Sequence, residues 1–169
     1  MEVRECILKR RSIRKFKEQQ VDNDTIKDIL ECAMAAPSAC NKQPWEFYVI
    51  KNQDLLNEIK SVGRYTNFNS PLVIVVCGNR ERTLSDRVND FYIQDCSAAI
   101  ENILLRVTSL NLGAVWCGLQ PMEIPYKKAK EVLKLTDNIE PLGMIHIGYP
   151  AEEKEERTQY NSDYVHFCE

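Results

Sequence analysis

The sequence predicts an α+β domain in which a central sheet is flanked by helices. Stretches with a helical apolar period alternate with stretches that are continuously apolar or that change polarity at every second residue. Their order lacks the regular strand–helix–strand repetition of a doubly wound parallel sheet. No linker or internal repeat divides the 169 residues, which are enough for one sizeable core. We therefore expect a single domain over residues 1–169.

The first third of the chain predicts two helices and a strand. Residues 2–10 form a short helix, and a longer one follows with Asp22 or Asp24 as its cap. Apolar residues recur on one face of this second helix: Ile26, Ile29, Leu30, Ala33 and Met34. It should end at Pro37, because the residue before a proline avoids the α conformation. Residues 45–51 alternate in polarity and are rich in aromatic and β-branched side chains, which predicts a strand.

The remainder of the chain predicts three helices and three strands. A short helix covers residues 55–63, and residues 71–78 are apolar on both faces, as in a central strand. Residues 79–89 are polar and predict a loop. The longest helix spans residues 90–111, and Gly113 suits its C-terminal cap. A strand, a helix and a strand follow in that order: residues 114–118, 123–135 and 142–149.

The C-terminal tail, residues 151–169, is polar except for three apolar side chains near its end: Tyr164, Val165 and Phe167. This pattern is typical of an added edge strand or of a segment that docks on another chain. We expect the tail to extend onto a partner subunit.

The composition argues against several classes of function. The formal net charge is -3 and the sequence pI is about 5.6. Nucleic acids and anionic membranes both call for a basic face, so neither is an expected partner. No apolar run approaches the roughly 18 residues of a membrane span. The N-terminus carries Glu2 and Glu5, and its apolar stretch is too short for a signal peptide. We therefore expect a cytoplasmic protein.

The cysteines and histidines indicate no metal site and no hydrolytic site. The seven cysteines are scattered and form no CxxC pair, as zinc and iron–sulfur sites require, so we expect free thiols in a reducing compartment. The only two histidines are His146 and His166, and His146 falls in a strand pattern as a core residue. We therefore assign no catalytic side chain, and in an enzyme of this kind a cofactor should carry the chemistry.

The densest chemical signal is KRRSIRKF, residues 9–16. Four cations lie within six residues, and Ser12 adds a hydroxyl. The forked donors of arginine match a phosphate group, so the segment is a candidate phosphate site. The competing interpretation is a solvated basic cluster at a helix C-terminus. The chain has no glycine-rich phosphate loop, so side chains would have to hold such a phosphate.

A second signal is the connector APSACNKQP, residues 36–44, between a helix pattern and a strand pattern. It contains two prolines, a serine, an asparagine and a glutamine, and no acid. Such a connector is either a plain turn or a stretch of backbone arranged to contact a ligand.

Four motifs, in this order, resemble the nitroreductase family of FMN-dependent oxidoreductases: RRSIRKF, ILECAMAAPSACNKQPWEFYVI, DCSAAIENILLRVTSLNLGAVWCG and PLGMIHIGYP. The pairing of RRSxRxF with APSxxNxQPWxF is specific, and the resemblance covers nearly the whole chain of a short, single-domain member. It implies an α+β fold with a central, mainly antiparallel mixed sheet. It also implies a homodimer with one FMN at each of two subunit interfaces.

The resemblance assigns the FMN phosphate, ribityl chain and pyrimidine edge to the basic motif. The residues carried over are Arg10, Arg11, Ser12 and Arg14. In many relatives two cations of the tail also hold the phosphate. Here Arg157 fills one of those places, but Glu155 stands where the second cation is expected, and Lys154 is a candidate to compensate.

The isoalloxazine ring is assigned to two further segments. The connector of the other subunit would lie along the ring, through Pro37, Ser38, Ala39, Asn41 and Gln43. Trp116, Cys117 and Gly118 match the segment that runs past the flavin near N5. Asn67 is carried over from a looser alignment.

The resemblance also implies a reaction. NADH or NADPH would pass a hydride to flavin N5, and the reduced flavin would then reduce a nitroaromatic, quinone or flavin acceptor in a ping-pong cycle. Three alternatives stay open: dehalogenation or ene reduction on the same scaffold, a non-catalytic flavin-binding protein, and an adaptor that uses the basic motif. The first of these calls for a lid over the flavin, and the candidate lids, residues 63–70 and 79–90, are short.

Overall fold

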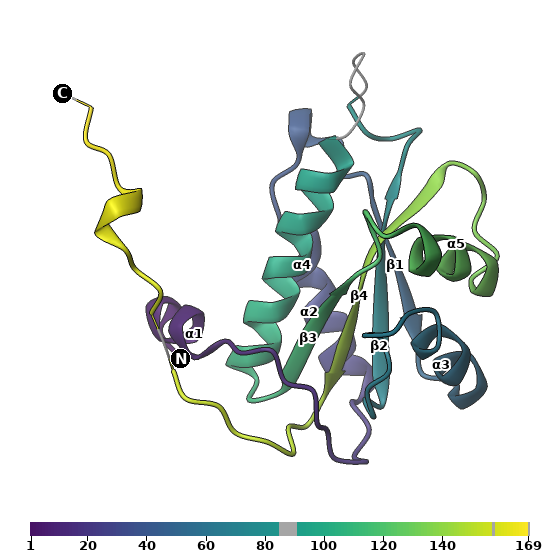
Figure 1. The fold of residues 1–169 in the computed structure, drawn as a ribbon, viewed down its shortest axis with the longest axis horizontal. Helices are drawn as coiled ribbons and strands as arrows, with labels where there is room; N and C mark the ends of the chain where they lie inside the picture. The colour runs from purple at the N-terminus through teal and green to yellow at the C-terminus, as the bar shows by residue number, and fades with distance from the viewer. Residues whose placement is uncertain (85–90, 157, 169) are drawn as a thin grey trace.

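The computed structural model describes residues 1–84, 91–156 and 158–168, and it confirms the predicted α+β class (Figure 1). The strands are β1 (Trp45–Ile50), β2 (Leu72–Asn79), β3 (Gly113–Gly118) and β4 (Ile139–Gly148). The α-helices are α1 (Val3–Lys9), α2 (Asn23–Met34), α3 (Gln53–Lys60), α4 (Phe91–Ser109) and α5 (Glu123–Val132). Short 3₁₀ turns lie at Ala39–Asn41 and Ser162–Tyr164.

The strands form one antiparallel sheet in the order β1-β2-β4-β3. The central strands β2 and β4 are buried along nearly their whole length, as the apolar residues 71–78 predicted for the first of them. The outer strand β3 pairs with β4 from Gly113 opposite Gly148 to Gly118 opposite Gly143. The side of β3 that faces away from β4 is therefore one of the two edges of the sheet.

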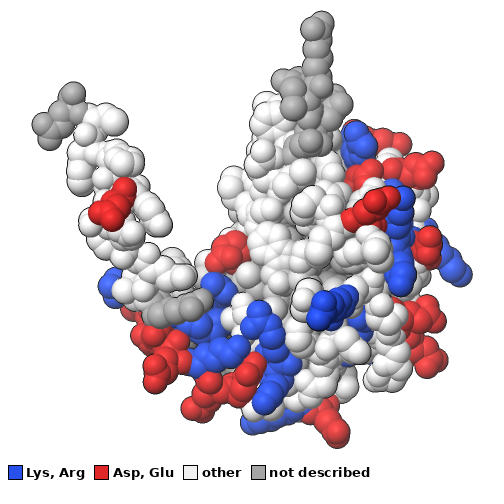
Figure 2. Space-filling model, in the orientation of Figure 1, with Lys and Arg blue, Asp and Glu red and all other residues white. Residues whose placement is uncertain are grey.

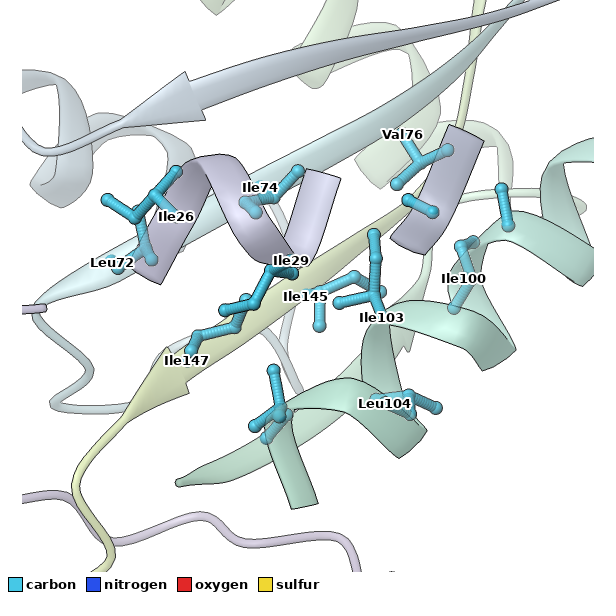
Figure 3. Packing of buried hydrophobic residues seen from close by; sticks show 14 of the residues in the cluster. Ile26, Ile29, Leu72, Ile74, Val76, Ile100, Ile103, Leu104, Ile145 and Ile147 are labelled. Carbon is cyan, nitrogen blue, oxygen red and sulfur yellow. The ribbon is translucent and has the colours of Figure 1, made fainter. Parts of the chain in front are cut away.

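Helices cover both faces of the sheet: α2 and α4 pack on one face, and α3 and α5 pack on the other (Figure 1). Alternate residues of β4 point to opposite faces. Ile145 and Ile147 join the core beneath α2 and α4, whereas Met144 joins the core beneath α3 and α5. Figure 3 shows the first core, where Ile29 of α2 and Ile103 of α4 meet the strands.

The start of α2 agrees with the sequence prediction, and its end lies earlier. The Asp22 side chain accepts the Thr25 N–H at 2.8 Å and so caps the first turn. The helix ends at Met34, before Pro37, because the chain tightens into a turn through the next two residues.

The prediction that Gly113 caps α4 is wrong. The helix ends at Ser109, and the nearby residue in the left-handed conformation is Asn111, with φ 58°. Gly113 instead opens β3, where a Cβ atom would lie 2.8 Å from Cγ2 of Ile13. Its missing side chain therefore allows the N-terminal segment to lie close against the sheet edge.

The N-terminal segment, residues 10–17, runs along the open edge of β3. A parallel bridge joins Ser12 to Ala114, and the Ile13 N–H donates to the Ala114 carbonyl at 2.8 Å. Main-chain pairing thus holds the basic motif beside the sheet.

The tail leaves the body of the domain as extended chain with a single turn at Ser162–Tyr164 (Figure 1). Residues 158–168 form no strand, so this segment adds no edge strand to the chain's own sheet. Its apolar side chains are exposed: Tyr160, Tyr164, Val165 and Phe167. Docking of the tail on a partner subunit stays a prediction.

The described residues contain no helix that is both long enough and apolar enough to cross a membrane. They also contain no cluster of three histidine, cysteine or acidic side chains that would hold a metal ion. The cysteines are free thiols, and four of them are buried: Cys6, Cys77, Cys96 and Cys117.

A small polar cluster is buried beneath the loop that follows α3. Lys60 Nζ donates to the Ser70 carbonyl at 2.6 Å, and Ser70 Oγ lies 2.8 Å from Nδ1 of His146. The Phe68 ring meets the imidazole edge-on, with 5.2 Å between ring centroids. His146 is fully buried, as predicted, and among the described residues its Nε2 atom has no hydrogen-bond partner. The cluster ties the loop to β4.

The stability of the fold should depend on pH through His146. Burial, and secondarily the Lys60 ammonium, lowers the pKa of His146 to about 3. A histidine in the unfolded chain has a pKa of about 6.5, so between these values the unfolded state binds the extra proton. The contribution to the free energy of unfolding is therefore complete above pH 6.5. It falls as the pH drops, by up to about 1.4 kcal/mol per pH unit.

Urea denaturation between pH 7.5 and pH 5 measures this dependence. The variant His146→Asn keeps a polar partner for Ser70 but does not titrate, so its stability should fall less steeply with acid than that of the parent protein. Equal slopes for the two proteins would contradict the assignment.

Candidate functional site

A cavity of about 810 Å³ opens at β3, between the loop that follows α3 and the start of α5. Most of its lining is apolar or aromatic. The lining comprises Arg14, residues 63–66, Phe68, residues 115–118 and residues 122–125. This is a space of the size that small-molecule sites occupy.

Two smaller cavities adjoin the large one through shared lining residues. Trp116 borders both the large cavity and a cavity of about 310 Å³ that is also lined by Arg10 and Ser12. A third cavity, of about 350 Å³, is lined by Ser12, Arg14 and Lys154. Figure 2 shows charged residues along the lower part of this face, where the N-terminal segment and the tail run in Figure 1, and a largely uncharged centre.

The position of Trp116 depends on a glycine in the neighbouring strand. A Cβ atom at Gly143 would lie 2.2 Å from the indole Nε1 of Trp116, so the indole fits only because position 143 has no side chain. The Trp116 side chain stays 37% exposed and separates the large cavity from the smaller one beside Arg10.

An acid of the tail holds the basic motif in place. The Glu152 carboxylate accepts the backbone N–H groups of Arg14 at 2.5 Å and of Lys15 at 3.2 Å. The bond from Arg14 is the main reason why the pKa of Glu152 is lowered. These two bonds fix the backbone of the motif and leave the side chain of Arg14 exposed.

The three arginines of the motif have different surroundings. The Arg11 guanidinium donates to the carbonyls of Leu8, Arg10 and Glu155 at distances of 2.9, 2.5 and 2.8 Å, so it fastens the motif to the tail. Arg10 lies 3.6 Å from the Glu101 carboxylate on α4. Arg14 makes a longer contact of 3.4 Å to the Ser12 carbonyl and lines two of the cavities.

The tail brings Lys154 to the same place. Lys154 Nζ donates to the Ser12 carbonyl at 2.6 Å and lies 3.5 Å from the Glu152 carboxylate. Glu155 lines the cavity but holds Arg11 through its backbone carbonyl. Arg157, the other cation expected here, lies outside the described residues.

The thiol of Cys117 lies in the lining of the large cavity. Its Sγ donates to the Tyr65 carbonyl at 3.4 Å. Burial raises the pKa of Cys117 to about 11, although the charge of Arg14 acts in the opposite direction. At neutral pH Cys117 is therefore a neutral thiol and a weak nucleophile.

The connector, residues 36–44, has an unusual backbone. Cys40, Asn41 and Gln43 have φ angles of 48°, 53° and 49°, in the left-handed region that residues with a side chain rarely adopt. Each such residue costs on the order of 1–2 kcal/mol, a cost that is typically found at functional sites. Ser38 Oγ accepts the Gln43 N–H at 2.9 Å and closes the loop on itself.

The structure brings together some of the predicted site residues and not others. Arg10, Arg11, Ser12 and Arg14 line the same set of adjoining cavities as residues 116–118. Within one chain these cavities include none of residues 36–44 in their lining, so the connector faces elsewhere. Asn67 is exposed and does not line the large cavity, although both of its neighbours do.

Several residues that shape the cavity or its surroundings were not identified from the sequence. Tyr65, Phe68 and Ile124 line the large cavity, but they belong to loops or helix starts with no periodic pattern that would mark them. Gly143 did carry a signal, because a glycine within a strand often marks a close approach by another group. Asp95 of α4, which accepts the Ala39 N–H at 2.9 Å, resembles any polar helix residue in the sequence.

Known proteins place this architecture in one family. The model of the nitroreductase family matches residues 7–65 and 59–149. A Methanothermobacter thermautotrophicus protein with the provisional name NADH dehydrogenase/NAD(P)H nitroreductase is 37% identical over 98% of this chain and 86% of its own.

Two solved structures share the fold at similar coverage. An FMN-dependent nitroreductase from Clostridium difficile has a TM-score of 0.86 and 30% identity, over 97% of this chain and 98% of its own. A nitroreductase from Desulfovibrio desulfuricans, provisionally named and solved in complex with FMN, has a TM-score of 0.84 and 28% identity, over 98% of this chain and 95% of its own. The chain belongs to the nitroreductase family of oxidoreductases.

Proposed function

We propose that this protein is an FMN-dependent NAD(P)H oxidoreductase that reduces nitroaromatic, quinone or flavin acceptors. The observation that carries the proposal is the continuity of two unlike surfaces. Cavities bordered by the basic motif adjoin a large, mainly apolar cavity, with which they share Trp116 and Arg14 in their linings. FMN has the same division, with a charged phosphate at one end and a flat, largely apolar ring at the other. The FMN-dependent enzyme and the FMN complex among the relatives support the same cofactor.

The phosphate end fits the cations that the structure gathers at Ser12. A phosphate monoester carries nearly two negative charges at neutral pH and needs paired cations when it leaves water. Arg14 and Lys154 border one cavity with Ser12, and Arg10 borders the next. Arg11, with three donors bound to carbonyls, supports this site by fixing the tail against the motif.

The ring end fits the lining of the large cavity. Val115, Phe68 and Tyr65 offer apolar and aromatic surface that excludes water from a bound ring. Gly118 brings backbone to the same place, and it has no side chain that would block the approach of the polar edge of a flavin. When bound, FMN supplies the hydride transfer. The residues bind it, orient it and shape the space for the nicotinamide and the acceptor.

The connector is proposed to complete the site of a second subunit. In one chain its exposed side chains, Asn41 and Gln43, lie outside the cavities that border the basic motif. A homodimer would place the Pro37–Gln43 segment of one subunit along the ring held by the other. The exposed apolar residues of the tail, among them Tyr164 and Phe167, would be covered by the same association.

The visible spectrum tests the proposed function. Purified protein titrated with FMN should bind it and turn yellow. NADH or NADPH added without oxygen should then bleach the colour, and a nitroaromatic or a quinone should restore it. Parallel reactions with the two nucleotides, followed by stopped-flow absorbance, would show which one is the preferred donor.

Each alternative gives a different result in the same assay. Bound FMN that neither nucleotide reduces would indicate a flavin-binding protein without this activity. Reoxidation by halogenated phenols or activated alkenes, but not by nitroaromatics or quinones, would indicate one of the other reductions. A protein that takes up no FMN would overturn the proposal.

The basic motif can be tested with Arg14→Ala. Charge-assisted hydrogen bonds contribute about 1.5–3 kcal/mol, so loss of this side chain should weaken FMN binding roughly tenfold to a hundredfold. The free energy of unfolding should change little, because the Arg14 side chain is exposed and its hydrogen bond to the Ser12 carbonyl is long, at 3.4 Å. Fluorescence titration of FMN and urea denaturation measure the two effects.

Arg4→Ala is the matched control, because it removes an exposed arginine of α1 that lines none of the three cavities at β3. It should leave the FMN affinity unchanged. If Arg14→Ala behaves in the same way as the control, Arg14 is not part of the phosphate site.

A further inference from the structure

We propose that Asp95 is a positioning residue for the flavin site, acting through the connector loop Ala39–Gln43 without touching the cofactor. The inference rests on the proposed function, because it concerns how the loop is prepared to contact a flavin. It adds a residue on α4, in the interior of the domain, to the set that determines FMN affinity.

Asp95 is buried, and it accepts a hydrogen bond from this loop. The side chain is 4% exposed, and Oδ1 accepts the Ala39 N–H at 2.9 Å. Among the described residues, Oδ2 has no hydrogen-bond partner. Aspartate is rarely buried without partners for its oxygens, and an apolar residue would pack at this helix position at lower cost. The bond to Ala39 is therefore the feature that accounts for a carboxylate here.

The loop needs an anchor because its own conformation is unfavourable. Cys40, Asn41 and Gln43 all have positive φ angles, which residues with a side chain keep only where surrounding contacts hold them. Three bonds tie the connector to itself: the N–H groups of Asn41 and Gln43 donate to the Ser38 carbonyl and hydroxyl, and the Lys42 N–H donates to the Ala39 carbonyl. The bond to Asp95 ties it to the domain.

The anchored loop turns hydrogen-bonding groups outward. The side chains of Asn41 and Gln43 are exposed. A loop that already has its bound conformation binds a ligand without the entropic cost of becoming ordered. Releasing Ala39 from Asp95 would restore that cost, so the affinity for FMN would fall although every group that contacts FMN is still present.

The test compares three variants of the full-length protein. Asp95→Ala removes the acceptor of the Ala39 N–H. Asp95→Asn keeps an oxygen that can accept it, and is the conservative rescue. Asn102→Ala is the matched control, because the Asn102 side chain, also on α4, donates to the Cys32 carbonyl of α2 at 2.9 Å, away from the loop. The measurements are the dissociation constant for FMN, the urea midpoint, and the hydrogen-exchange rate of the Ala39 amide without FMN.

The expected result separates a positioning role from a merely structural one. Asp95→Ala should bind FMN about tenfold more weakly or worse and should exchange the Ala39 amide faster. Asp95→Asn should stay within about threefold of the parent protein in both measurements. Asn102→Ala should lower the urea midpoint while the FMN affinity and the Ala39 exchange rate stay at the parent values.

Two results would overturn the inference, and they can be told apart from failure of the proposed function. If the parent protein binds FMN and Asp95→Ala binds it equally well, Asp95 has no positioning role. The same conclusion follows if the Ala39 amide is no less protected in Asp95→Ala. A parent protein that binds no FMN would instead refute the proposed function, and this inference with it.

Discussion

The close contact between the N-terminal segment and the edge of β3 is the constraint on which the site depends. The Ile13 N–H bonds to the Ala114 carbonyl, and Gly113 leaves room for the Ile13 side chain. This pairing holds a highly charged segment along the sheet edge, although its cations repel one another there. The tail then packs on that segment, with Glu152 bound to its backbone. The basic motif is thus held between the edge of β3 on one side and the tail on the other.

Much of the fold could be predicted because periodicity and burial agree along most of the chain. The central strand predicted at residues 71–78 is such a case, and it is confirmed. The cap at Asp22, predicted from residue type, is also confirmed. The prediction for Gly113 was wrong, and the cause is physical. A glycine needed for a close approach and a glycine needed for a left-handed turn look the same in a sequence. Only the position of Ile13 distinguishes the two.

The charged residues of the site could be predicted from the sequence. The residues that line the cavity could not, because their positions depend on how the loops fold. The basic motif was found from its composition, and the structure places most of it around shared cavities. Composition did not show that the Arg11 donors are bound to carbonyls, since this depends on where the tail runs. Tyr65 and Ile124 line the large cavity only because of the way their loops fold, which the sequence pattern does not show. Asp95 could not be distinguished from other polar residues of its helix, because its partner is 56 positions away in the sequence.

The pairing of Gly143 with Trp116 has a consequence for how sequences of this kind can diverge. The indole occupies the volume that any side chain at position 143 would need, so the two positions share one fixed space between neighbouring strands. A sequence that acquires alanine or a larger residue at 143 has to move the indole of Trp116 or replace it with a smaller residue. Position 116 borders both the large cavity and the cavity beside Arg10. A substitution at Gly143 would therefore also change the shape of the cavity at position 116, and with it the molecules that the cavity admits.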